Sequence, residues 1–167
     1  MIHPAALTID QLLRECQIVR TRRSGPGGQH RNKVETAVVI THLPSGVKGE
    51  ASERRSQSQN HAMAVFRLRV NLALAVRHGR LLPILPSADW QARCRSQRLA
   101  LSASHADFPA LLAEALDVLA SLGTDMKMAA RGLGISASQL VRLLKLEPRA
   151  LAQVNVRRRA LGQTPLR

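Results

Sequence analysis

The stretch from Ala37 to Ala51, AVVITHLPSGVKGEA, constrains the fold most strongly, because a turn signal separates two short strand-like runs. Ala37 to Leu43 is rich in β-branched residues, which favour strands. Pro44 to Gly46 is typical of a turn, and the chain returns over Val47 to Ala51. This stretch therefore predicts an antiparallel hairpin.

A long helix is expected after the hairpin. Ser56 and Gln59 have capping-box spacing, and the apolar period continues to about His78, where Gly79 would end the helix. The positions expected to be buried on this helix are Val65, Leu68, Leu72, Ala75 and Val76.

The residues before the hairpin complete a first domain. Ile9 to Cys16 predicts a short helix with Leu12 and Leu13 on its inner side, and Gln17 to Thr21 predicts a strand. A small, mostly antiparallel sheet covered by one long helix is an α+β arrangement. We assign this domain to residues 1–80.

Beyond residue 80 the sequence predicts a linker and then an all-α domain. Pro83 and Pro86 mark the linker, residues 81–106, in which Ala88 to Leu101 could form a connecting helix that exposes Arg93, Arg95 and Arg98. Residues 107–167 form the helical, basic C-terminal domain. Its helices are expected over Pro109–Leu122, Asp125–Arg131, Ala137–Leu146 and from Pro148 to Gly162.

Two of these helices have helix-turn-helix proportions. The turn is expected over Gly132 to Ser136, and the outer face of the following helix would show Ser138, Gln139, Arg142 and Lys145. The same pattern fits packing or protein contact, so both interpretations stay open.

The charge of the chain points to a polyanionic partner. There are 25 Lys and Arg against 11 Asp and Glu, a net charge of +14, and both halves of the chain are basic. The aromatic residues are Phe66, Phe108 and Trp90, which argues against reading single strands by base stacking. Phosphate contact is the favoured mode of binding.

Several other classes of protein do not fit the sequence. Cys16 and Cys94 are too few for a disulfide framework and lack metal-ligand spacing, so we expect reduced thiols, no metal and no cofactor. No run of apolar residues is long enough to cross a bilayer. We therefore expect a cytoplasmic protein without a membrane partner.

A glycine-rich segment, SGPGGQHRNKVETAV, separates the first expected strand from the hairpin. It fits neither the P-loop nor the dinucleotide-binding pattern. Gly25, Gly27 and Gly28 allow positive φ and close approach of the main chain to another molecule. Basic residues around it would contact phosphates, and these are Arg20, Arg22, Arg23, Arg31, Lys33, Arg54 and Arg55.

Residues 9–76 resemble the catalytic domain of class I peptide chain release factors and of the short release-factor-like proteins that rescue stalled ribosomes. The motifs that carry the resemblance are GGQ (Gly27, Gly28, Gln29), the following HxNK (His30, Asn32, Lys33), THLPSG and ERRSQ. Together they are highly specific.

The resemblance implies hydrolysis of the ester of peptidyl-tRNA in the peptidyl transferase centre of the large ribosomal subunit. In that family the main-chain N–H of the glutamine stabilises the oxyanion and leaving group, and its side chain helps to place the water. Gln29 would take this part, with Gly27 and Gly28 allowing the conformation and rRNA supplying the rest. His30 could be a general base, or an RNA or packing contact. Gln29 is also the candidate for N5-methylation by a glutamine methyltransferase.

The sequence differs from full release factors, because only 26 residues precede Gly27. Codon-independent release is therefore expected, on a whole stalled ribosome or on a split large subunit. The C-terminal helices would bind tRNA or rRNA through Arg142, Lys145, Arg157, Arg158 and Arg159. The alternative is a non-enzymatic nucleic-acid-binding protein that uses the helix-turn-helix-like domain. Hydrolysis of free peptidyl-tRNA is disfavoured, since the loop has no catalytic partners of its own.

Overall fold

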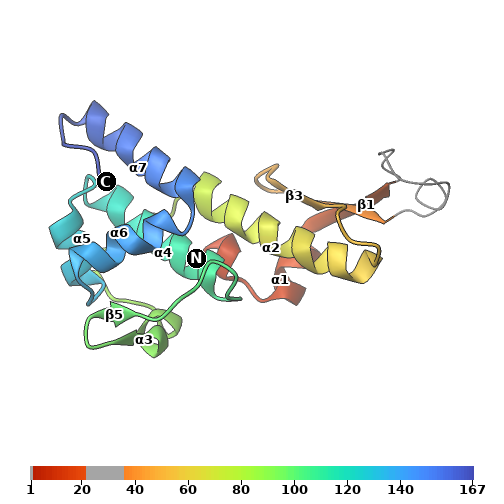
Figure 1. Ribbon diagram of the computed structural model, residues 1–167, viewed down its shortest axis with the longest axis horizontal. Coiled ribbons are helices and arrows are strands. Elements are labelled where there is room, and N and C mark those ends of the chain that lie inside the picture. Colours follow the sequence, from red (N-terminus) through yellow and green to blue (C-terminus); the bar gives the residue numbers. More distant parts are fainter. Residues whose placement is uncertain (1, 22–35) are drawn as a thin grey trace. The chain divides into compact units, whose positions relative to one another are not determined.

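A computed structural model describes residues 2–21 and 36–167 (Figure 1). These residues form two compact units, one up to Ala75 and one from Val76 to Arg167. Residues 81–106, expected as a linker, lie within the second unit. The architecture is mixed, with a small antiparallel sheet and several helices, as the sequence predicts.

The first unit is built on a three-stranded antiparallel sheet. Its strands are β1 (Cys16–Thr21), β2 (Ala37–His42) and β3 (Lys48–Ala51), in the order β1-β2-β3. Val38 lies opposite Ala51, so the predicted hairpin is confirmed. Helix α2 (Gln57–Ala75) packs on β2 and β3.

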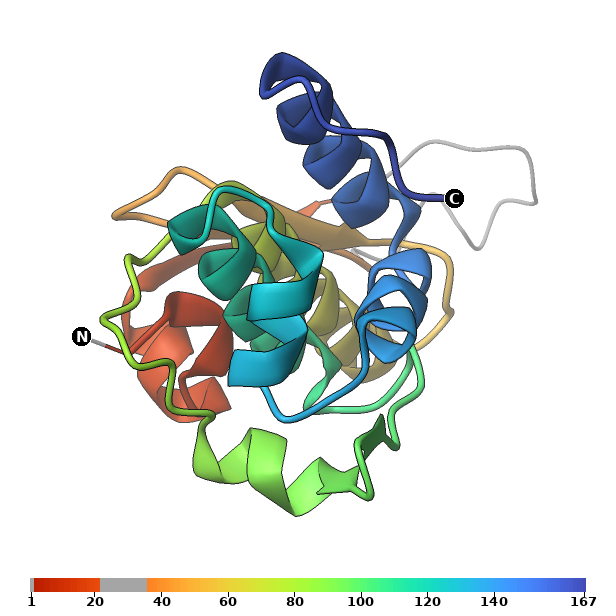
Figure 2. The ribbon, with the colours of Figure 1, turned by 90° about the vertical axis from the view of Figure 1, so that its left-hand side faces the viewer.

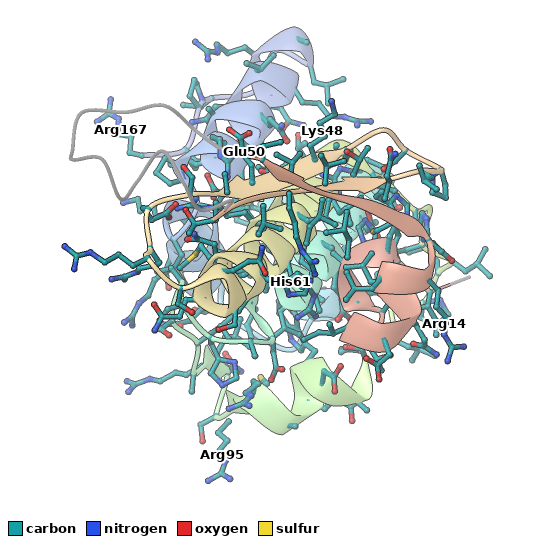
Figure 3. All side chains as sticks on the ribbon, turned by 90° about the vertical axis from the view of Figure 1, so that its right-hand side faces the viewer. Arg14, Lys48, Glu50, His61, Arg95 and Arg167 are labelled. Atoms are coloured by element: carbon teal, nitrogen blue, oxygen red, sulfur yellow. The ribbon has the colours of Figure 1, made fainter. Side chains whose placement is uncertain are left out.

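Strand β3 approaches α2 closely at a glycine. Gly49 and Ala51 face the helix, whereas Lys48 and Glu50 project from the opposite side of the sheet (Figure 3). A Cβ atom at Gly49 would lie 2.3 Å from the carbonyl oxygen of Ala64 and 2.3 Å from the amide nitrogen of Leu68. A side chain at this position would therefore clash with the helix backbone, which cannot relieve the clash by a change of rotamer.

The end of α2 differs from the prediction. Val65, Leu68 and Leu72 are buried as expected, but the predictions for Ala75 and Val76 are wrong. Ala75, the last residue of the helix, is exposed, and Val76 lies beyond the helix and is only half-buried. The helix ends before His78, whose N–H donates to the Asp117 carboxylate at 3.0 Å. The chain therefore leaves the helix before Gly79, and the residues that follow the helix are held by a hydrogen bond to the Asp117 side chain.

The short N-terminal elements follow the local sequence rules. A 3-10 turn, η1 (Pro4–Ala6), precedes α1 (Ile9–Arg14). Thr8 and Gln11 form a reciprocal capping box at the start of α1. Leu12 is fully buried, so α1 is fixed by one apolar anchor.

The second unit is helical except for one small hairpin. Its elements in chain order are α3 (Ala88–Arg93), β4 (Cys94–Arg95), β5 (Arg98–Leu99), α4 (Phe108–Ser121), α5 (Met126–Gly132), α6 (Ala137–Lys145) and α7 (Pro148–Ala160). Every residue from Phe108 to Leu119 is buried, so α4 is the centre of this core. Figure 2 shows this unit from the side on which α5 and α6 face the viewer.

The connecting helix is shorter than the range considered from sequence. It ends at Arg93, and residues 94–99 form a hairpin instead. Ser96 and Gln97 make the turn with φ of 47° and 61°. This left-handed conformation costs a residue with a side chain about 1–2 kcal/mol, so neither residue signals the turn by its type.

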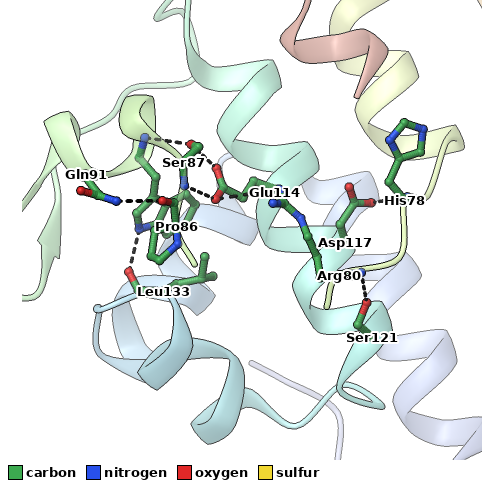
Figure 4. A network of polar contacts seen from close by, with 10 residues as sticks. His78, Arg80, Pro86, Ser87, Gln91, Glu114, Asp117, Ser121 and Leu133 are labelled. Carbon is green, nitrogen blue, oxygen red and sulfur yellow. Dashed lines mark hydrogen bonds and ion pairs between the residues drawn. The ribbon is translucent and has the colours of Figure 1, made fainter. Parts of the chain in front are cut away.

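Two buried carboxylates on α4 fix the segment that enters the second unit (Figure 4). Asp117 accepts from Arg77 at 3.3 Å and from the His78 N–H. Glu114 accepts from the N–H of Ser87 at 2.8 Å and from its hydroxyl at 2.5 Å. Residues 77–87 are thereby tied to α4 at both ends.

Helices α5 and α6 have the predicted helix-turn-helix order. Asp125 caps α5, and Ser136 caps α6 by accepting from the Gln139 N–H at 3.3 Å. In the turn, Gly134 has φ of 68° and the apolar Ile135 is buried.

Candidate active site

The residues of the expected catalytic motif lie outside the described part of the chain. These are Arg22, Arg23, Gly27, Gly28, Gln29, His30, Arg31, Asn32 and Lys33. What the structure describes is the frame that holds the two ends of the segment 22–35. The predicted site residues on this frame are Arg20, Arg54 and Arg55.

The segment 22–35 connects β1 to β2 at one end of their antiparallel ladder. Thr21, the last residue of β1, lies opposite Ala37, the first residue of β2. Ala37 is buried against the core. The antiparallel ladder thus fixes where residues 22–35 leave the domain and where they return.

Asn60 ties the return of this segment to the neighbouring turn. It is fully buried in the first turns of α2. Its side-chain Nδ2 donates to the carbonyl of Thr36 at 2.7 Å and to the carbonyl of Arg54 at 2.9 Å. Its Oδ1 accepts from the N–H of Arg54 at 2.9 Å. One amide therefore joins Thr36, next to the GGQ-bearing segment, to the main chain of the arginine turn.

Asn60 is not among the site residues predicted from the sequence. It stands on the buried stripe of α2, four residues before Ala64 and eight before Leu68, both fully buried. A polar residue on a buried stripe needs hydrogen-bond partners. That break in the apolar pattern was the available signal.

The turn that carries Arg54 and Arg55 is also held from further along α2. Arg67 donates to the carbonyl of Glu50 at 2.9 Å and forms an ion pair with Glu53. Hydrogen bonds from the Arg67 guanidinium, supported by main-chain donors, lower the pKa of Glu53 to about 2. The nearby carboxylate is thus already paired with a cation of α2.

Three predicted cations of the frame are exposed. Arg20 on β1 and Arg54 and Arg55 after β3 carry outward side chains. Within the part of the chain that the structure describes, no hydrogen bond or ion pair of these three guanidinium groups is seen. Exposed guanidinium groups of this kind can contact phosphate.

The THLPSG motif has a structural role in the turn between β2 and β3. His42 is buried, with its Nε2 3.0 Å from Glu15 Oε2 and its Nδ1 2.7 Å from Ser45 Oγ. Ser45 Oγ also accepts from the Val47 N–H at 3.3 Å. The motif lies at one end of β2, and the Thr21–Ala37 pair lies at the other end of the ladder. Its histidine is therefore remote from the residues that flank the segment 22–35.

In the second unit, the predicted RNA-binding residues lie on two helices, Arg142 and Lys145 on α6 and Arg157 to Arg159 on α7. Ser138, Arg142 and Lys145 form an exposed stripe on α6, and Gln139 is half-buried beside it. On α7, Arg157 and Arg159 are exposed.

Arg158 differs from its two neighbours. It is half-buried and donates to the carbonyls of Thr124 at 2.7 Å and Thr164 at 2.8 Å. Its guanidinium therefore fastens the end of the chain to the α4–α5 connection.

Neither a metal centre nor a membrane span is found among the described residues. No cluster of three or more His, Cys, Asp or Glu with the spacing to hold a metal ion occurs there. None of the described helices has the length and hydropathy needed to cross a bilayer.

Comparisons with known proteins find a family match that covers most of the first unit. Residues 6–80 match the family described as the RF-1 domain. The chain is 47% identical over 82 residues to a chloroplastic peptide chain release factor of Arabidopsis thaliana, covering 46% of this chain and 18% of the relative. It is 46% identical over 71 residues to peptide chain release factor 1 of Xylella fastidiosa, covering 42% and 17%.

A third relative gives the same picture. Peptide chain release factor 2 of Paramagnetospirillum magneticum is 50% identical over 58 residues, covering 35% of this chain and 16% of the relative. The chain thus spans less than a fifth of the length of these relatives. Residues 6–80 are a class I release-factor-like RF-1 domain that carries the GGQ motif.

Proposed function

We propose that this protein hydrolyses the ester of peptidyl-tRNA in the peptidyl transferase centre of the ribosome. The observation that carries the proposal is the GGQ sequence, Gly27 to Gln29, inserted between β1 and β2 of a domain that matches the RF-1 family. Release of a peptide chain is the activity that the names of the three relatives state.

In this proposal, the chain supplies a positioned donor rather than a covalent nucleophile. The main-chain N–H of Gln29 stabilises the oxyanion, its side chain helps to place the water, and Gly27 and Gly28 allow the close approach. Asn60 and the β1–β2 ladder hold the ends of the segment. Arg20, Arg54 and Arg55, with the cations of the segment itself, contact rRNA phosphates.

We further propose that release is independent of a stop codon and rescues stalled ribosomes or split large subunits. Support comes from the basic helical unit that accompanies the RF-1 domain. The exposed stripe of α6 and the exposed Arg157 and Arg159 of α7 offer phosphate contacts that require no codon. We place the activity in the cytoplasm, where a glutamine methyltransferase would modify Gln29.

The test is release of labelled peptide from three substrates. These are ribosomes stalled without a codon in the A site, isolated large subunits carrying peptidyl-tRNA, and free peptidyl-tRNA. We expect wild type to release peptide from one or both ribosomal substrates, and Gly28→Ala to abolish that release. Failure on both ribosomal substrates would refute the proposal, and release from free peptidyl-tRNA alone would refute its dependence on the ribosome.

A second candidate function is non-enzymatic binding of duplex DNA. It is favoured by the helix-turn-helix order of α5 and α6 and by the exposed Ser138, Arg142 and Lys145. Selection of one duplex sequence by the full chain, together with no peptide release, would favour this candidate over the hydrolase.

A further inference from the structure

The β4–β5 hairpin places two arginines opposite each other. Arg95 pairs with Arg98 across the two short strands, next to the turn made by Ser96 and Gln97. All four residues are exposed. Directly opposed like charges disfavour a hairpin, and so do two side-chain-bearing residues with positive φ.

The hairpin is nevertheless firmly attached to the helix-turn-helix. The buried Trp90 of α3 donates from Nε1 to the Leu133 carbonyl at 2.8 Å. Cys94 Sγ lies 3.4 Å from the Gly134 carbonyl, and the carbonyl of Gln97 accepts from the Ser136 N–H at 3.3 Å. The hairpin is therefore fixed against the α5–α6 turn and the first residue before α6, below those helices in Figure 2.

The two hairpin arginines differ from the neighbouring Arg93, which is paired with a carboxylate. Arg93, two residues before Arg95, forms an ion pair with Asp107 at 2.9 Å. Among the described residues, no hydrogen bond or ion pair of the Arg95 or Arg98 side chain is seen. Local repulsion is therefore not relieved by a carboxylate within this part of the protein.

Most acidic side chains of the second unit are already engaged. Asp89 lies in the first turn of α3, and the others bind donors of their own unit, namely Asp107, Glu114, Asp117, Asp125 and Glu147. The uncompensated charge at the hairpin and on the exposed stripe of α6 is consequently positive. The carboxylates of this unit therefore do not supply the complementary charge.

We propose that Arg95 and Arg98 together form a phosphate-binding site for the backbone of structured RNA, on a hairpin that contacts Ser136 at the start of α6, the helix with the exposed stripe Ser138, Arg142 and Lys145. Guanidinium groups match phosphate oxygens in geometry, and two of them opposed on a fixed hairpin suit one doubly contacted phosphate. A bound phosphate also removes the repulsion between the two arginines. This inference extends the proposed function, because it gives the second unit its own RNA contact.

The inference is tested by the affinity of the full chain for deacylated tRNA, measured by fluorescence anisotropy from 50 to 300 mM salt. The test variant is Arg95→Gln with Arg98→Gln. The matched control is Arg14→Gln with Lys48→Gln, which removes two exposed charges from the first unit. Thermal melts of all three proteins verify that they fold alike.

We expect the hairpin variant to bind tRNA about tenfold more weakly, because charge-assisted bonds to one phosphate are lost. Its plot of log affinity against log salt should be shallower by about 0.7–0.9, the value for one phosphate contact. The control should keep most of the affinity and the slope. Equal losses in the two variants, or no loss in either, would overturn the inference.

Two further outcomes separate this inference from the proposed function. Weakened tRNA binding in the hairpin variant, in a protein that releases no peptide, would support the phosphate site and refute the hydrolase. Tighter binding of wild type to a duplex DNA of equal length than to tRNA would overturn RNA as the partner. If wild type releases peptide but the hairpin variant binds tRNA as tightly as wild type, the phosphate site alone would be refuted.

Discussion

Replacing Asn60 by alanine should uncouple the GGQ-bearing segment from the arginine turn. Asn60 makes three hydrogen bonds from a fully buried side chain, to the carbonyl of Thr36 and to both main-chain groups of Arg54. In the variant these three groups lose their partner. The perturbation therefore acts on the base of the segment and on the placement of Arg54 at once.

The expected loss of stability follows from the partners left behind. Each buried polar group without a partner costs about 1–3 kcal/mol. Arg54 is exposed, so water can satisfy part of the deficit on its main chain. We therefore expect the free energy of unfolding to fall by about 2–4 kcal/mol, less than the sum for three dry groups.

Asn71→Ala is the matched control. Asn71 is on the same helix and its Nδ2 donates to the carbonyl of Lys48, the first residue of β3, at 2.7 Å. It is only half-buried and lies toward the other end of α2. Its replacement should lower the free energy of unfolding by about 1 kcal/mol.

Two assays distinguish positioning from general stability. Urea denaturation gives the free energies of unfolding, and peptide release at saturating ribosome gives the rate constant. Misplacement by about 1 Å can cost up to about 10²-fold in rate, so we expect Asn60→Ala to lower the maximal rate strongly while half-saturation changes little. Asn71→Ala should release peptide at the wild-type rate. Equal rates for the two variants, at temperatures where both are folded, would refute the positioning argument.

Two predictions concern other contacts of the first unit. Gly49→Ala would place a Cβ 2.3 Å from helix backbone, so urea denaturation should show a loss of about 3 kcal/mol or more. A Cβ added at Gly79 has no atom of the described residues within 4 Å, so Gly79→Ala should change the free energy of unfolding by about 1 kcal/mol or less, and similar losses in the two variants would contradict this. Because Arg67 lowers the pKa of Glu53 to about 2 in the folded state, below its ordinary 4.5, the pair stabilises the fold above pH 4.5 and this is lost as the pH falls toward 2. Both side chains are more than two-fifths exposed, so Glu53→Gln should cost about 0.5 kcal/mol at pH 6 and nothing near pH 2, and a difference that persists at pH 2 would refute the ion-pair explanation.

The sequence predicts those parts of the fold that local chemistry determines. The β2–β3 hairpin follows from β-branched runs around Pro44–Gly46, and the caps of α5 and α6 follow from Asp125 and Ser136. In each case the residues that determine the turn or the cap lie within a few positions of it in the sequence.

Features set by distant contacts could not be predicted in the same way. Beyond the end of α2, the N–H of His78 donates to Asp117, 39 residues further along the chain. The β4–β5 turn is made by Ser96 and Gln97, residue types that rarely adopt positive φ, and it is held from outside by Ser136. The role of Arg158 as a fastening for Thr124 and Thr164 is likewise tertiary.

The candidate site likewise has a part that is predictable from local sequence and a part that depends on distant contacts. The GGQ motif and its basic neighbours are recognisable from sequence alone, because glycines beside one glutamine form a distinctive local pattern. The support from Asn60 depends on three main-chain groups brought together by folding.

The most direct measurement of the central claim is single-turnover peptide release from ribosomes stalled with an empty A site. Wild type would be compared with Gln29→Ala and Gly28→Ala. Because alanine keeps the main-chain N–H at position 29, Gln29→Ala should retain part of the activity, whereas Gly28→Ala, which restricts the backbone that presents this donor, should lose about 10²–10³-fold or more. Equal rates for the two variants, or no release by wild type, would contradict the account.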